Sequence, residues 1–74
     1  MKLKDSSFIP WIEQIFESKQ AKMGGIVRRD AYNVRRYASV EALILAADIR
    51  GFHVILCGSQ YIIICNTKGL QIIT

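Results

Sequence analysis

Residues 53–66, HVILCGSQYIIICN, decide the fold of this chain. Two runs of apolar and β-branched residues flank the dipeptide Gly58-Ser59. A glycine that opens a two-residue loop is typical of the type II′ turn between hairpin strands. The sequence therefore predicts an antiparallel hairpin of residues 53–57 and 60–66. Its expected register pairs Cys57 with Gln60, Leu56 with Tyr61, Val54 with Ile63 and Phe52 with Cys65.

The segment that follows the hairpin predicts a third strand. Residues 66–69, Asn-Thr-Lys-Gly, have the order of a type I turn closed by a left-handed glycine, and residues 70–74 are again apolar. The expected sheet is thus a C-terminal three-stranded antiparallel β-meander. One of its faces is expected to carry Phe52, Val54, Leu56, Tyr61, Ile63, Cys65 and Ile73. The other is expected to carry His53, Ile55, Cys57, Ile62, Ile64, Leu70 and Ile72.

Both faces of this sheet are apolar, although antiparallel sheets in small domains usually leave one face to water. Two arrangements satisfy the pattern. Either one helix covers each face, or both helices cover one face and a second copy of the chain covers the other.

The first helix is predicted at about residues 7–22. Ser7 is a suitable N-cap, and Pro10 is tolerated because the first turn of a helix lacks intrahelical N–H partners. Gly24-Gly25 ends the helix. Its apolar stripe has helical spacing and comprises Phe8, Trp11, Ile12, Ile15 and Phe16.

A second helix is predicted over residues 39–50, with Ser39 as its N-cap and Gly51 beyond its end. It is apolar over most of its surface, so burial on more than one side is expected. Leu45 lies on its narrow polar edge, between Glu41 and Asp48.

Residues 26–38, between the helices, are harder to interpret. We expect a short edge strand at 26–29 and then an irregular or single-turn stretch. The segment fits a helix equally well, with one apolar face that comprises Val27, Ala31, Val34 and Ala38.

The expected fold is therefore a single α+β domain of residues 1–74. No apolar run approaches the roughly 20 residues of a membrane helix, and the first residues lack a signal-peptide pattern. These features predict a cytoplasmic protein without membrane contact. Two cysteines, Cys57 and Cys65, are too few for a disulfide framework. They are expected on opposite faces of one hairpin, which argues against a disulfide between them. Both are therefore expected to be buried, reduced thiols.

The net charge of +4 comes entirely from residues 22–36, because the segments on both sides sum to zero. Arginines alternate with tyrosines there, a combination that contacts phosphates and stacks on bases. The predicted partner-binding residues are Lys22, Arg28, Arg29, Tyr32, Arg35, Arg36 and Tyr37. The alternative is that the charges are a solvated face and the two tyrosines are structural.

No catalytic residue is predicted, and neither a cofactor nor a metal is expected. His53 is the only histidine and lies among isoleucines, which is typical of a packed side chain. Two thiols and one histidine fall short of the four ligands of a structural zinc. Gly24-Gly25 lacks the preceding strand and the Walker pattern of a phosphate-binding loop.

These observations predict a non-catalytic binding module that docks an acidic partner, with nucleic acid slightly favoured. The alternative is a protein-binding inhibitor or adaptor of mobile-element type. In general form the chain resembles small proteins of phages, plasmids and other mobile elements, many of which work by binding. A homodimer is also expected, because the doubly apolar sheet and Leu45 leave more apolar surface than a chain of 74 residues easily hides.

Overall fold

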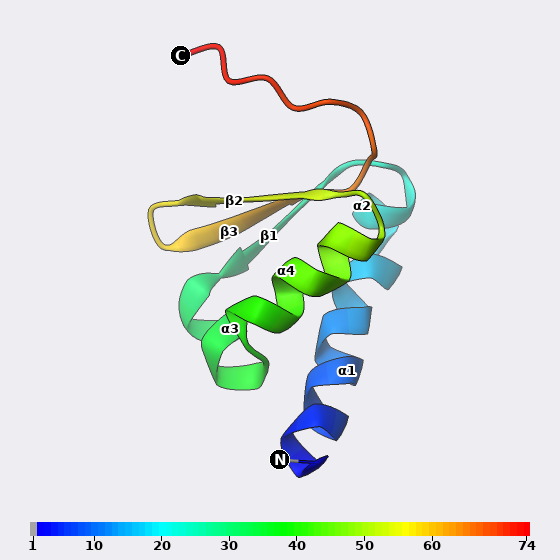
Figure 1. Cartoon of the computed structure of the whole chain (residues 1–74), viewed down its shortest axis with the longest axis vertical. Coiled ribbons are helices and arrows are strands. Elements are labelled where there is room, and N and C mark those ends of the chain that lie inside the picture. The colour runs from blue at the N-terminus through cyan, green and yellow to red at the C-terminus, as the bar shows by residue number, and fades with distance from the viewer. Residues whose placement is uncertain (1) are drawn as a thin grey trace.

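A computed structural model describes the backbone of residues 2–74 and the side chains of residues 10–74. The architecture is α+β, as predicted. Helices α1, α3 and α4 lie on one side of a three-stranded antiparallel sheet, and the C-terminal segment passes on the other side (Figure 1). The elements in chain order are α1 (Lys2–Glu17), α2 (Lys19–Lys22), β1 (Ile26–Asp30), α3 (Ala31–Tyr37), α4 (Val40–Ile49), β2 (His53–Cys57) and β3 (Gln60–Ile64).

The hairpin of β2 and β3 has the predicted register. Cys57 pairs with Gln60 beside the turn, and Val54 pairs with Ile63 in the middle of the ladder. Gly58 has a φ of 62°, which a glycine adopts without strain. The local turn chemistry was therefore sufficient to place this part of the sheet.

The third strand of the sheet is β1 and not the C-terminal segment, so the predicted meander is wrong. The strand order is β1-β3-β2, which confirms the edge strand expected at residues 26–29. Backbone bonds from Cys65 N to Gly25 O (2.9 Å) and from Ala31 N to Ser59 O (2.7 Å) extend the β1–β3 ladder at both ends. Because β1 already occupies that edge of β3, residues 70–74 form no strand.

The first helix differs from the prediction at both ends. It begins at Lys2, so Ser7 lies inside α1 and is not its N-cap, and Pro10 lies within the helix. Residues 2–6 include no strong helix breaker, and for this reason the cap preference of Ser7 did not set the start. The helix is interrupted at Ser18, where the backbone is extended (ψ 157°). The Ser18 hydroxyl accepts a hydrogen bond from Ala21 N at 3.3 Å and so caps the separate helix α2.

Residues 31–37 form the helix α3, where an irregular or single-turn stretch was expected. Ala31 and Val34 are buried, so the alternative helical face is correct for these two residues, whereas Val27 lies in strand β1. Helix α4 matches the prediction closely. The Ser39 hydroxyl accepts a bond from Ala42 N at 3.0 Å. Bonds from Gly51 N to Asp48 O and from Phe52 N to Ala47 O, both 2.9 Å, end the helix in a Schellman motif.

The core lies between the helices and one face of the sheet. Its fully buried side chains are Ile15, Val34, Leu43 and Ile63. Seven residues were predicted to share one face of the sheet. Of these, Leu56 and Ile73 are exposed, and the other five face the core: Phe52, Val54, Tyr61, Ile63 and Cys65. The arrangement is the one in which the helices cover a single face.

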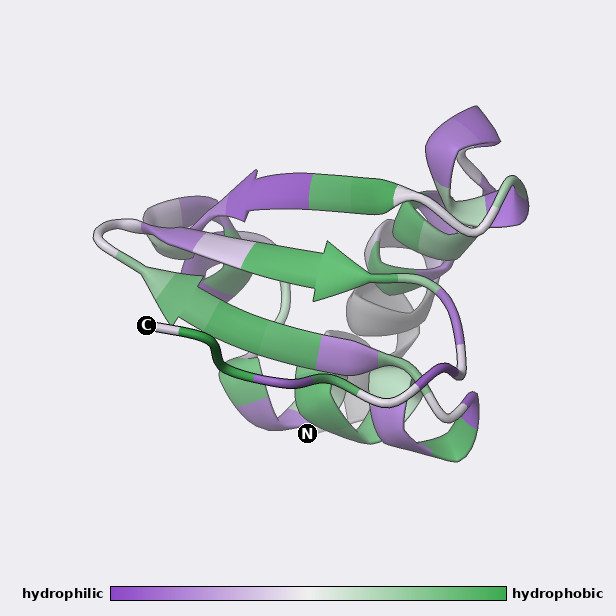
Figure 2. Ribbon diagram, turned by 90° about the horizontal axis from the view of Figure 1, so that it is seen from above, coloured by the Kyte–Doolittle hydropathy of each residue, from purple (hydrophilic) through white to green (hydrophobic). Residues whose placement is uncertain are grey.

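The other face of the sheet has no helix over it, and apolar residues run along β2 and β3 in this view (Figure 2).

Helix α4 is also less buried than its composition predicted. Leu43 and Ala47 are buried, but Ile44, Leu45 and Ile49 are 50%, 61% and 73% exposed. The expectation of burial on several sides was wrong because only one side of α4 meets the core.

Candidate functional site

The basic residues predicted from the sequence lie on three consecutive elements at the β1 edge of the sheet. Lys22 ends α2, Arg28 and Arg29 lie in β1, and Arg35 and Arg36 lie in the last turn of α3. We call these five residues the basic edge. Helices α2 and α3 both contact β1, so the strand is bracketed by cationic helices.

The two arginines of β1 emerge on opposite faces of the sheet. Arg28 pairs with Ile62 on the uncovered face, and Arg29 pairs with Tyr61 on the helix side. The backbone groups of Arg28 point away from β3, because residues alternate along an antiparallel ladder. Arg29 Nη1 donates to Arg28 O at 2.7 Å. The Arg29 guanidinium therefore bonds a carbonyl oxygen on the free edge of β1 and places a positive charge where another strand would otherwise pair.

The side chains of α3 form a connected cluster of arginine and aromatic rings. Arg36 Nη1 donates to the Tyr32 hydroxyl at 3.1 Å, and its guanidinium carbon lies 5.5 Å from the centre of the Tyr37 ring. The bond to Tyr32, followed by the interactions with Tyr37, raises the pKa of Arg36 above its ordinary value. Arg36 is thus a permanent cation.

The two predicted tyrosines have different surroundings. Tyr37 stacks on Trp11 of α1 with ring centroids 5.9 Å apart and an interplanar angle of 24°. Tyr32 is 57% exposed and has no such aromatic neighbour among the described residues. Tyr37 therefore helps to attach α3 to α1, while Tyr32 presents its ring to solvent.

The basic edge is not neutralised by acidic side chains. Among residues 10–74, the only ion pair joins Arg50 to Glu13, away from this edge. Asp30 lies at the end of β1 and makes no capping bond to α3. The charge of the basic edge is consequently available to a partner.

A shallow hollow of about 220 Å³ lies between α2 and β1. Its lining consists of Ser18, Gln20, Ile26, Val27, Arg28 and Arg29. Sequence reasoning placed Lys19 and Lys22 late in a single helix but missed that they form a separate helix, α2, which brings Gln20 to the hollow. The signal that was available is Ser18, a good N-cap residue inside the predicted helix.

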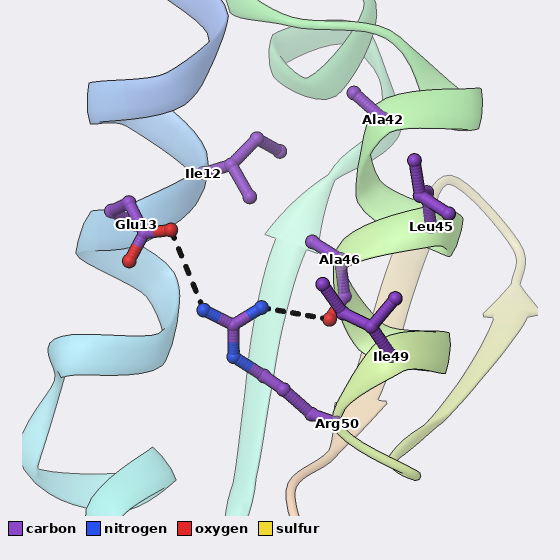
Figure 3. A pocket seen from close by; sticks show the side chains of 7 residues that line it. All are labelled: Ile12, Glu13, Ala42, Leu45, Ala46, Ile49 and Arg50. Atoms are coloured by element: carbon purple, nitrogen blue, oxygen red, sulfur yellow. Dashed lines mark hydrogen bonds and ion pairs between the residues drawn. The ribbon is translucent and has the colours of Figure 1, made fainter.

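A second surface lies between α1 and α4 and contains Leu45, the residue predicted for an oligomer interface. The groove has a volume of about 220 Å³ and apolar walls from both helices (Figure 3). Arg50 crosses it, with Nη2 3.4 Å from Glu13 Oε2 and Nη1 donating to Ala46 O at 2.8 Å. Sequence reasoning identified Leu45 but missed Ile49, one turn later and more exposed.

The remaining candidate groups do not assemble into a reactive site. His53 Nε2 lies 2.6 Å from Lys68 O at the start of the C-terminal segment. Both cysteines are free, and Cys65 is buried as predicted, with a thiol pKa raised by desolvation. Cys57 is exposed, contrary to prediction, because it ends β2 beside the turn. No cluster of three or more potential metal ligands occurs among the residues that the structure describes.

Comparison with known proteins found no family model, curated protein or solved structure similar to this chain. Within the described residues, none of the helices has the length and apolar character needed to cross a membrane.

Proposed function

We propose that this protein is a non-catalytic, cytoplasmic binding protein that docks nucleic acid through the basic edge. The observation that carries the proposal is the arrangement of five cations on three consecutive elements, without an acidic partner among residues 10–74. Such a cluster of one lysine and four arginines along one edge of the sheet suits a phosphate backbone, which has a regular spacing of negative charge.

The aromatic rings of α3 support the same proposal. Tyr32 exposes its ring beside Arg36, and an exposed tyrosine next to an arginine is a platform on which an unpaired base stacks. Tyr37 contributes by fixing α3 against Trp11.

Recognition by this edge should depend little on base sequence. Helix α3 has seven residues, and its arginines lie in its last turn, so it offers no long face to a DNA groove. Contacts to phosphates position a protein without reading sequence. The role that fits is a small regulator or architectural factor, and self-association would present two basic edges to one polyanion.

A second candidate is a protein-binding inhibitor or adaptor of mobile-element type, with an acidic protein as its partner. The exposed apolar residues of α4 favour it, because an interface needs apolar anchors as well as steering charges. The two candidates differ in their response to salt, since an apolar interface is much less sensitive to it.

The test is a fluorescence anisotropy titration with random-sequence single-stranded DNA, RNA and duplex DNA at 50 and 200 mM salt. About five phosphate contacts predict a loss of affinity of about 10²- to 10³-fold over this range. Changing Arg35 alone to Gln should reduce the log–log salt slope by about one unit.

Lys68→Gln is the matched control, because Lys68 is an exposed cation outside the basic edge. No binding of any nucleic acid at 50 mM salt would contradict the nucleic-acid proposal. Full binding by a variant with Arg28, Arg29, Arg35 and Arg36 all changed to Ala would contradict the assignment of the site.

A further inference from the structure

Helix α4 has an unpartnered stripe that faces the groove between α1 and α4. Ala42, Leu45, Ala46 and Ile49 have helical spacing and all line the groove, together with Ile12 from α1 (Figure 3). Leu45 is 61% exposed and Ile49 73% exposed. A stripe of alternating small and large apolar residues is what a helix presents to another helix.

The stripe is complementary to itself when two copies of α4 run antiparallel. Leu45 then meets Ala46 of the second copy, so a large side chain lies opposite a small one. The same alignment places Ala42 opposite Ile49 of the second copy, again a small residue against a large one. These pairings follow from a two-fold axis that passes between positions 45 and 46.

Charges agree with this alignment. The same axis brings Glu41, in the first turn of α4, opposite Arg50 of the second copy, at its C-cap. Arg50 would then lie between Glu13 of its own chain and Glu41 of the other. Antiparallel helices also place their dipoles in opposition.

We infer that α4 pairs antiparallel with α4 of a second copy, in the register that sets Leu45 against Ala46. The two copies would form an isologous interface in which α1 and α4 of each chain make a four-helix layer. The inference rests on the homodimer expected from the sequence and names its surface.

The first experiment measures mass by sedimentation equilibrium at 10 to 100 µM. The wild type should have twice the 8.4 kDa chain mass. Leu45→Glu and Ile49→Glu should each be monomeric, with an unchanged circular dichroism spectrum because both side chains are exposed. Ile44→Glu is the matched control: Ile44 is 50% exposed on the same helix but lies outside the groove, and this variant should stay dimeric.

The second experiment tests the register with the variant Ala42→Cys, Ile49→Cys in a Cys57→Ser background. Positions 42 and 49 of one helix are about 10 Å apart along its axis and cannot form a disulfide with each other. Mild oxidation should therefore give a covalent dimer, and Ile44→Cys in the same background should not.

The outcomes separate the proposals. A monomeric wild type overturns both self-association and this interface, while the nucleic-acid proposal is judged by its own titration. A dimer that survives Leu45→Glu but not Ile44→Glu overturns the surface assigned here. A dimer without the 42–49 crosslink overturns the register.

Discussion

Strand β3 carries three isoleucines in succession, and the two faces of the sheet give them different surroundings. Ile63 points toward the helices and is 0% exposed, whereas Ile62 and Ile64 point to the uncovered face and are only half-buried. In the sequence the two faces are equally apolar. The difference shows that the helices use only one of them for the core of a single chain and leave apolar surface on the other.

The largest effect is expected from a substitution on the face of the sheet that the helices cover. Ile63→Ala should lower the free energy of unfolding by about 2–5 kcal/mol, because it leaves a cavity where helices and sheet meet. Ile62→Ala should lower it by about 1 kcal/mol, the span of strand preference on a partly exposed position. Urea denaturation followed by circular dichroism measures both. Equal losses for the two variants would mean that the second face is also covered in solution.

A smaller effect is expected when the covering layer is weakened without a change in the core. Ser39→Ala removes the hydroxyl that accepts the bond from Ala42 N and should cost about 1 kcal/mol. Ser39→Asp keeps a capping acceptor and should retain most of the stability. Thermal unfolding of the two variants checks this, and an unchanged midpoint for Ser39→Ala would show that α4 is held by packing alone.

The smallest effect distinguishes the two thiols. Burial raises the pKa of Cys65, so above about pH 8.5 the unfolded chain loses this proton while the folded chain keeps it. Cys65 should therefore make the protein less stable as pH rises above about 8.5. Urea denaturation at pH 7.5 and 9.5 measures the change, and Cys65→Ala should reduce it.

Thiol labelling provides a control for that result. Cys57 is exposed and should react with a maleimide in the folded protein, whereas Cys65 should react only on unfolding. Rapid modification of both cysteines under native conditions would show that Cys65 is not shielded.

The accuracy of the sequence predictions follows the range of the interactions involved. The hairpin and α4 were predicted correctly because their turns and caps, Gly58, Ser39 and Gly51, act on neighbouring residues. Helix α3 was predicted only as an alternative because its apolar positions are few and small, and part of its attachment is the distant stacking of Tyr37 on Trp11.

The third strand was assigned wrongly for the same reason. Both residues 26–30 and residues 70–74 have strand composition, and only one edge of β3 remains after the hairpin forms. Tertiary bonds decide between them: Cys65 N to Gly25 O and Asn66 Nδ2 to Gly24 O, at 2.9 and 3.2 Å. The members of the basic edge were evident from charge alone, but their arrangement around β1 depends on this topology.

The strand order β1-β3-β2 also determines the sequence in which the strands pair during folding and which fragments of the chain can form a sheet. Strand β1 pairs only with β3, so Asp30 pairs with Gln60, which lies far along the chain. Cys57 pairs with the same residue across a two-residue turn. Closing the longer loop costs more entropy, which places the docking of β1 after the hairpin. A fragment that ends before Gln60 therefore contains two of the three strands and no pair of them that can bond.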